Sequence, residues 1–478
     1  MAADTHSTTL NHDKHMNKGI RFKLFLMMVL QFFIWGAWLP LIFGYLPSLG
    51  FSATNPPAEL SSVTKHLPDW LAAFFSEQAM ILNAFPIAAI VGMFFSNQFA
   101  DRNFAAQRFL AFSHFIGGLA ILSCGFSKSF WPFYSLMLLH CLLYVPTISI
   151  TNSIAFAAMK DAQQEFGIVR MGGTIGWILA AWPFTFIFVD WTAVNAANPL
   201  GLVAWIGEAL KHPLVGDAAK AATKWTYIVS GFASLALAAF SFVLPHTPAK
   251  KVVSGEAKFA WLEALRLLKH PFILVLWLVT LIDSTVHNSY FMWTGSFLGT
   301  PVDKGGVGVA SNWIMPVMSI GQIAEILTMF VLGATLKRLG WKWTMVFGIL
   351  GHAARFAVYA FFPQHKELII LVQVLHGICY AFFFATVYIF VEEFFPKDAR
   401  SSAQGLFNVM ILGVGALIAA TFCPGLFSKM TQGGVTDFKS LFLIPLGCAS
   451  AAAIALALFF HPPKSAKPTV GAGTAPSH

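Results

Sequence analysis

Long apolar runs dominate the sequence and alternate with short segments rich in Lys, Arg, Pro or Gly. A helix of about 20 apolar residues spans the hydrocarbon core of a bilayer, and it satisfies every backbone polar group within itself. The alternation of apolar and polar residues that a membrane β-barrel requires is absent. The runs therefore predict twelve transmembrane helices, at 24–47, 76–98, 107–127, 130–156, 169–189, 225–245, 271–298, 310–336, 343–362, 367–391, 403–424 and 440–461.

The longest connection on the predicted cytoplasmic side, 246–270, carries several lysines and an arginine and divides the runs into two sets of six. Two bundles joined by a flexible tether would hold a substrate between them near the middle of the membrane. The predicted organisation is a cytoplasmic tail at 1–23, a six-helix bundle at 24–245, the linker at 246–270, a second bundle at 271–461 and a disordered cytoplasmic tail at 462–478.

Composition and charge agree with a membrane protein. Hydrophobic residues make up 57% of the chain and charged residues 11%, whereas about a quarter of the residues of a soluble domain are charged. The net charge of +9 arises from basic residues in short loops, where they set topology, so we expect no nucleic-acid binding. Most Lys and Arg lie on the inside when both termini are cytoplasmic, and the polar N-terminus lacks the apolar core of a signal peptide.

Two segments on the predicted outer face, 51–70 and 190–224, contain Pro, Trp and amphipathic turns. We expect them to form short helices at the membrane interface, where they cover the bundle. A role in substrate gating stays open as the alternative.

Polar residues within the apolar runs indicate function, because lipid makes them costly. Asp283, His287, Tyr290 and Thr294 recur at helical spacing in the seventh run, so one helix face is predicted to line a cavity. The spacing of Asp283 and His287 also allows the two groups to exchange a proton.

Gln322 and Glu325 lie three residues apart in the eighth run and share a second polar face. A carboxylate in mid-membrane costs at least ~2.5 kcal/mol, so Glu325 needs a partner, a water-filled cavity or a proton. The alternative is a structural acid that is paired with Arg355 or with a helix terminus.

Other intramembrane polar residues are individually weak candidates, because such groups often form only interhelical hydrogen bonds. They are Gln31, Asn152, Arg170, His352, His376, Gln404 and Asn408. Aromatic residues beside polar positions suit stacking on a planar ligand, and these are Trp35, Trp177, Phe291 and Tyr380. We find no motif for a covalent nucleophile, a phosphate-binding loop or a metal, so we expect no enzyme activity, no cofactor and no metal.

Six motifs in order resemble those of the nucleoside:proton symporter family of the major facilitator superfamily. They are LQFFIWGAW at 30–38, YVPTISITNS at 144–153, RMGGTIGW at 170–177, LPHTP at 244–248, SIGQIAE at 319–325 and SAQGLF at 402–407. NQFADR at 97–102 is a weak match to the superfamily's GxxxDR motif. The resemblance covers nearly the whole membrane region and implies the major facilitator fold.

The resemblance implies that a nucleoside binds in a central cavity and that its transport is coupled to proton entry. By motif position, the expected contacts are Arg170, Thr174, Trp177, Gln322 and Glu325, with Asn288 and Phe291 near the seventh-helix contacts. His376 and Tyr380 are added from their polar or aromatic chemistry. Arg170 lies near the predicted cytoplasmic edge, so an arginine that extends to the interface is the alternative.

The resemblance also implies a cytoplasmic gate at Asp101 and Arg102. Ala381 stands where relatives carry an acid in the tenth helix, so a proton needs another carrier. Glu325 is favoured for this role over Asp283 with His287.

The resulting prediction is a monomeric proton-coupled nucleoside importer of the bacterial inner membrane. A transporter of the same fold for a sugar or another polar solute, a uniporter, and a sensor that does not transport remain the alternatives.

Overall fold

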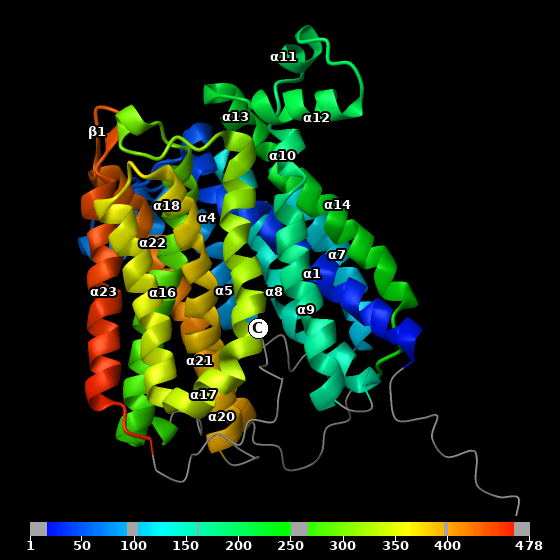
Figure 1. Ribbon diagram of the computed structural model, residues 1–478, viewed down its shortest axis with the longest axis vertical. Coiled ribbons are helices and arrows are strands. Elements are labelled where there is room, and N and C mark those ends of the chain that lie inside the picture. Colours follow the sequence, from blue (N-terminus) through cyan, green and yellow to red (C-terminus); the bar gives the residue numbers. More distant parts are fainter. Residues whose placement is uncertain (1–16, 93–103, 160–161, 250–265, 396–399, 463–478) are drawn as a thin grey trace, which may run out of the picture.

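A computed structural model describes residues 17–92, 104–159, 162–249, 266–395 and 400–462. The helices run roughly along one direction (Figure 1), with α16 to α23 on the left of the view and α1, α7, α8, α9 and α14 on the right. Helices α4 and α5 lie between these groups, and α11 to α13 project from the end that we call the upper end.

The described residues of the N-terminal half form seven main helices and several short ones. The main helices are α1 (Lys18–Tyr45), α4 (Glu77–Leu82), α5 (Ala84–Val91), α7 (Ala106–Cys124), α8 (Phe130–Ala158), α9 (Ala162–Ala181) and α14 (Lys224–Phe240). The short ones are η1 (Leu46–Leu49), η2 (Ala58–Leu60), α2 (Ser61–Thr64), α3 (Asp69–Ala72), η3 (Ala73–Phe75), α10 (Phe184–Ile187), α11 (Trp191–Ala196), α12 (Leu202–Lys211), α13 (Gly216–Ala222) and η5 (Ser241–Val243).

Where it is described, the C-terminal half is also helical apart from one small hairpin. Its helices are η6 (Leu267–Lys269), α16 (Pro271–Gly299), η7 (Val302–Lys304), α17 (Ser311–Phe361), α18 (Lys366–Leu371), η8 (Val372–Val374), α19 (Leu375–Cys379), η9 (Tyr380–Ala385), α20 (Thr386–Phe394), α21 (Arg400–Asn408), η10 (Val409–Val414), α22 (Gly415–Lys429) and α23 (Phe438–Phe459). Elements η9 and η10 are π-helical, and the antiparallel hairpin consists of β1 (Thr431–Gln432) and β2 (Val435–Thr436).

All twelve predicted runs coincide with described helices, although the second extends into the gap at 93–103. By length and composition, eight described helices can cross a membrane, and a bent pair makes nine. Helix α17 counts once but contains two predicted runs, which meet at Gly340 (φ 70°, ψ 177°). The two predicted interfacial segments form short helices, as expected.

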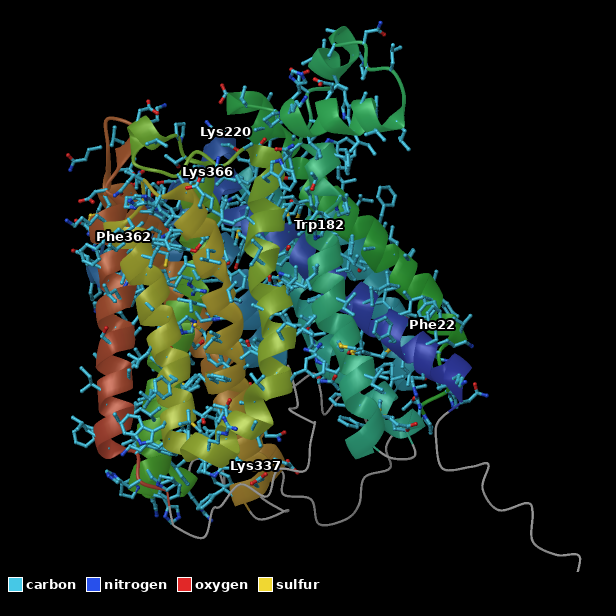
Figure 2. The ribbon with its side chains drawn as sticks, in the orientation of Figure 1. Phe22, Trp182, Lys220, Lys337, Phe362 and Lys366 are labelled. Carbon is cyan, nitrogen blue, oxygen red and sulfur yellow. The ribbon has the colours of Figure 1, made fainter. Side chains whose placement is uncertain are left out.

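The outer surface carries large apolar side chains between charged ends. Phe22, Trp182 and Phe362 are 65%, 46% and 47% exposed. Figure 2 shows Lys220 and Lys366 at the upper end and Lys337 at the opposite, lower end. This distribution suits a protein whose solvent is lipid along its middle and water at its ends.

Helices α1 and α9 pack closely because α9 presents two glycines four residues apart. A methyl group on Gly172 would lie 2.6 Å from the backbone oxygen of Phe25, and one on Gly176 would lie 2.1 Å from that of Val29. Small residues at this spacing allow transmembrane helices to approach to backbone contact. This close contact fixes the position of the later residues of α9 relative to α1.

A buried polar network joins four N-terminal helices. Gln31 Nε2 donates to Thr147 Oγ1 at 2.9 Å, and Nε2 of His114 lies 2.9 Å from Gln31 Oε1. The other ring nitrogen of His114 lies 2.9 Å from Ser234 Oγ, and the Tyr144 hydroxyl donates to the backbone oxygen of Gln31 at 2.6 Å. Gln31 therefore ties helices together, which is the structural role open to a lone intramembrane amide.

Contacts near the upper end connect the N-terminal helices to the C-terminal ones. Asn83 Nδ2 donates to Thr421 Oγ1 at 3.0 Å, and Ser311 Oγ donates to the Leu214 backbone oxygen at 2.6 Å. A methyl group on Gly295 would lie 2.8 Å from the backbone oxygen of Pro40. The two halves are therefore closely packed on this side of the pocket described next.

Candidate functional site

A pocket lies between the N-terminal and C-terminal helices and receives side chains from α1, α4, α5, α8, α9, α16, α17, α19, η9, η10 and α22. It contains about 1170 Å³ of space between protein atoms, part of which is open to solvent. Apolar and aromatic side chains form most of its wall, and a few polar groups converge on it, as is typical of small-molecule sites.

The structure brings together every residue that was expected to contact substrate. All nine line this pocket: Arg170, Thr174, Trp177, Asn288, Phe291, Gln322, Glu325, His376 and Tyr380. His287, expected to serve in proton coupling, also lines it. These residues come from five elements in both halves of the chain, so helix packing alone makes them neighbours.

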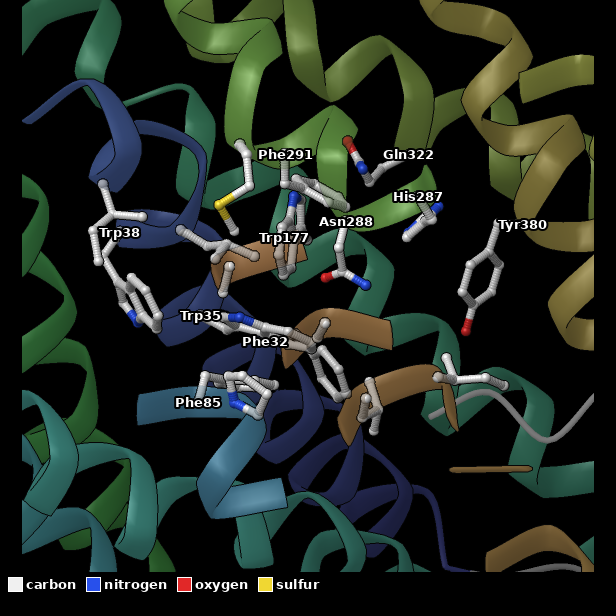
Figure 3. Close-up of a pocket in the computed structure, with 18 of the residues that line it drawn as sticks. Phe32, Trp35, Trp38, Phe85, Trp177, His287, Asn288, Phe291, Gln322 and Tyr380 are labelled. Atoms are coloured by element: carbon white, nitrogen blue, oxygen red, sulfur yellow. The ribbon is translucent and has the colours of Figure 1, made fainter. Parts of the chain in front are cut away.

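Aromatic rings form one wall of the pocket. Trp35 stacks on Phe85, with ring centroids 4.6 Å apart and planes 15° from parallel, and it meets Trp177 edge to face at 5.2 Å. Trp177 in turn meets Phe291 at 5.9 Å. Figure 3 shows these rings beside Asn288 and Phe32. Such a surface suits a flat heterocycle, which stacks on the faces or edges of aromatic rings.

Arg170 turns into the pocket rather than toward the membrane interface, so the alternative of an interfacial arginine is wrong. Arg170 is 7% exposed, and its guanidinium lies 4.0 Å from the centre of the Phe32 ring. The side chain passes over Gly173, where a methyl group would lie 2.0 Å from Nη1 of Arg170. The guanidinium therefore occupies space that a side chain at residue 173 would fill.

Gln322 and Glu325 share the pocket face of α17, as their spacing predicted. Gln322 Oε1 is buried without a hydrogen-bond partner among the described residues, so it is an acceptor available to a ligand. Glu325 lies near enough to Arg170 for the two charges to interact. Close packing fixes this helix, because a methyl group on Gly377 would lie 2.2 Å from the Glu325 backbone nitrogen.

Asp283 does not line the pocket, which corrects the expectation that its helix face borders a cavity throughout. Among the four residues of that face, only His287 reaches the pocket, whereas Asp283, Tyr290 and Thr294 are buried in helix packing. The reason is that α17 and α19 cover the rest of the face. Asp283 Oδ1 instead accepts a hydrogen bond from His352 Nδ1 at 2.9 Å.

Arg355 is not the partner of Glu325, so the structural pairing considered for that acid is wrong. Arg355 is completely buried, with its guanidinium 3.9 Å from the centre of the Tyr290 ring. Its Nη1 donates to His376 Nδ1 at 3.0 Å. His376 therefore lies between a buried cation and the pocket.

The remaining expected residues are placed outside the pocket or outside the description. Asn152, Gln404 and Asn408 do not line the pocket, and Gln404 Nε2 donates to Glu392 Oε2 at 3.1 Å. Ala381, where the resemblance led us to expect an acid in relatives, is fully buried and also does not line it. The proposed gate residues, Asp101 and Arg102, lie outside the described residues.

Sequence reasoning missed part of the apolar wall of the pocket and the partner of one buried histidine behind it. Phe32 and Trp38 lie within the 30–38 motif and recur with Trp35 at helical spacing, a signal that could have found them. Phe85 is one aromatic residue among many in an apolar run, and nothing marks it. His352 appeared only as a lone intramembrane histidine, and its partner is 69 positions away.

Among the residues that the structure describes, no group of three His, Cys, Asp or Glu side chains is arranged to hold a metal ion. Four cysteines on four helices are buried, and Cys448 is exposed. The arrangement instead offers hydrogen-bonding groups, one acid, one arginine and stacked rings around a space, which suits reversible binding of a polar, planar solute.

Comparison with known proteins gives a family match over almost the whole chain. The family model described as "Nucleoside H+ symporter" matches residues 18–211 and 199–465. The putative nucleoside transporter YegT of Escherichia coli is 29% identical over 413 residues, which cover 85% of this chain and 84% of YegT. The E. coli nucleoside permease NupG is 25% identical over 458 residues, covering 92% and 96% of the two chains.

Solved structures agree on the fold. The crystal structure of nucleoside transporter NupG matches with a TM-score of 0.70 at 22% identity, covering 93% of this chain and all of that one. That of a D-xylose-proton symporter matches with a TM-score of 0.61 at 15% identity, covering 94% of this chain and 100% of that one. At these identities the likeness concerns the fold alone, which is the expected all-α major facilitator fold.

Proposed function

This chain belongs to the nucleoside H+ symporter family, and from that premise we propose that its central pocket binds a nucleoside during proton-coupled import. It is a multi-pass membrane transporter and not an enzyme. The observation that carries the proposal is the convergence of all nine expected contact residues on one pocket between the two halves of the chain.

The chemistry of the pocket fits the two parts of a nucleoside. The wall of Trp35, Trp177 and Phe291 offers ring faces and edges to the base. Gln322, whose Oε1 has no partner within the described part of the chain, and Glu325 accept hydrogen bonds from ribose hydroxyls or exocyclic amines. Arg170 donates to carbonyl oxygens and balances the charge of Glu325.

The mechanism that we propose is alternating access between two six-helix bundles, 24–245 and 271–461, joined by the linker 246–270. The pocket lies between them, so rocking one bundle against the other would expose it to each side in turn. The contacts of Asn83 with Thr421 and of Ser311 with Leu214 hold the upper end closed. We place this end on the periplasmic side of the inner membrane, with both termini in the cytoplasm and a monomer as the working unit.

Proton coupling here requires a group other than residue 381, since alanine cannot carry a proton. Glu325 within the pocket, and Asp283 with His287 beside it, are the acid sites that we propose for this role. The cytoplasmic gate is assigned to Asp101 and Arg102 on the motif match alone.

Uptake of labelled uridine and adenosine by a bacterium that lacks its own nucleoside carriers tests the function. Expression of the chain should confer uptake that unlabelled nucleosides suppress, that xylose and glucose leave unchanged, and that a protonophore abolishes. A Glu325→Ala variant expressed at the same level should take up less of both nucleosides. Equal suppression by the sugars would replace the nucleoside proposal with a sugar transporter of the same fold.

A further inference from the structure

Four ionisable side chains, which we call the histidine row, lie in a continuous series from the protein interior to the pocket. Asp283 is fully buried on α16 and accepts a hydrogen bond from Nδ1 of His352 on α17 at 2.9 Å. Nε2 of the same imidazole lies 3.3 Å from Nδ1 of His287. The His287 ring stacks on that of His376, with centroids 4.9 Å apart and planes 26° from parallel.

Only the outer end of the histidine row reaches the pocket. His287 and His376 line it, whereas His352 and Asp283 do not. Figure 3 shows His287 beside Gln322 and Asn288 in the pocket. A proton in the pocket therefore meets His287 or His376 first, and His352 links His287 to Asp283.

From this geometry we propose that Asp283 and His352 form the coupled proton site of the transporter, and that His287 passes the proton between this site and the nucleoside pocket. The proposal rests on the proposed nucleoside function. It names His352 as a new coupling residue and moves the proton from Glu325 to a site behind the pocket wall.

The proton transfer balances without any further reactant. In the resting state, His352 Nδ1–H donates to the Asp283 carboxylate, and His287 Nδ1–H donates to Nε2 of His352. A proton from pocket water binds Nε2 of His287, and the proton on its Nδ1 moves to Nε2 of His352. The products are a neutral His287 in its other tautomer and an imidazolium at His352 paired with the Asp283 carboxylate.

Charge around the pair favours one added proton. Asp283 Oδ2 has no hydrogen-bond partner among the described residues, so the carboxylate interacts chiefly with His352, and a buried carboxylate is stabilised by a cation at hydrogen-bond distance. The titratable and charged side chains that face the histidine row are Tyr290 on α16, Arg355 on α17, Cys379 on α19 and Tyr380 on η9, with Arg170 and Glu325 across the pocket. Arg355, the fixed cation, is bonded to His376 and so disfavours a proton on that ring rather than on His352.

Nucleoside and proton influence each other through His287. Asn288 follows it on the same helix, and Phe291 packs against its ring at 5.4 Å. A nucleoside at these residues would cover His287 and keep water from removing the proton. By linkage, the proton would then tighten nucleoside binding by the same factor.

The experiment measures proton uptake when uridine binds to the full-length protein in detergent, followed with a pH indicator in weak buffer. The expected result is one proton per uridine for the wild type and none for His352→Asn. Asparagine keeps a donor toward Asp283 but cannot carry the proton. His140→Asn is the matched control. His140 is buried, bonds the Gly117 backbone oxygen through Nδ1 and lies away from the histidine row, so proton uptake should be unchanged.

Full proton uptake by His352→Asn would overturn the proposal. If His352→Asn does not purify as a single species, His287→Gln decides by the same criterion, because it breaks the path but leaves the Asp283 pair intact. A wild type that binds neither uridine nor adenosine would refute the nucleoside function. One that binds uridine without proton uptake would refute the coupling site alone.

Discussion

A methyl group on Gly173 would lie 2.0 Å from Nη1 of Arg170, so the substrate-facing arginine occupies the space that the glycine leaves empty. The same methyl group would lie 2.8 Å from Cδ2 of Phe32, the ring on which the guanidinium rests. The absence of a side chain at residue 173 therefore determines where the charge of residue 170 lies in the pocket.

The first prediction follows from this contact. Gly173→Ala should displace Arg170 and weaken uridine binding about tenfold, since a hydrogen bond to a charged group contributes about 1.5–3 kcal/mol. Calorimetry on the purified protein measures this. The double variant with Arg170→Ala should bind no more weakly than Arg170→Ala alone, because both changes remove one interaction. Gly447→Ala, at an open position of α23, should have no effect, and additive losses in the double variant would contradict the interpretation.

The second prediction concerns the polar face of α17. Gln322→Ala and Glu325→Ala should each weaken uridine binding by about 1–3 kcal/mol, because each leaves a ligand group without its partner. Thr328→Val is a control on the same helix, since Thr328 bonds only its own helix at the Ala324 oxygen and does not line the pocket. Wild-type affinity in both pocket variants, measured by calorimetry, would move the binding site elsewhere.

The third prediction concerns the contact between α1 and α9. A methyl group on Gly176 would lie 2.1 Å from the Val29 backbone oxygen, which cannot move without separating the helices. Gly176→Ala should therefore lower the thermal unfolding midpoint by several degrees, in line with the 1–3 kcal/mol that overpacking typically costs. Gly425→Ala on α22 meets no atom within 4 Å and should leave the midpoint unchanged. An unchanged midpoint in Gly176→Ala would show that this contact is not tight.

Apolar runs predicted the helices well because lipid imposes a length and a composition on each span. Motif position then identified the pocket residues of α9 and α17, since residues such as Arg170 and Glu325 have no other low-cost place in a membrane. Their convergence needed the major facilitator arrangement, which the resemblance supplied.

Tertiary partners could not be predicted in the same way. Asp283 and His287 have a spacing that suits a direct pair, yet the structure places His352 between them. The choice depends on how α17 lies against α16, and no local pattern encodes it. Similarly, Arg355 bonds His376 rather than Glu325, although both arrangements keep the arginine within the bundle.

The last prediction concerns the closed upper end. Thr421→Val removes the hydrogen bond from Asn83, which joins the two halves. A neutral hydrogen bond contributes about 1 kcal/mol, so the population open at the upper end should rise about fivefold. Spin labels at Lys220 and Lys366, which Figure 2 places at that end, report the distance between the two halves. A larger fraction of molecules should show the longer distance between the labels. Cys448→Ala provides the background, because the other four cysteines are buried.

Labels at Phe22, near the start of α1, and at Lys337, at the lower end, test whether the motion is a rocking of the two halves. Their distance should shorten as the upper pair separates, because two rigid bundles that pivot around a central site move in opposite senses at their two ends. Thr335→Val is the matched control: Thr335 bonds only the Val331 oxygen of its own helix, so neither distance should change. A longer upper distance with an unchanged lower one would indicate local opening of α22 in place of alternating access.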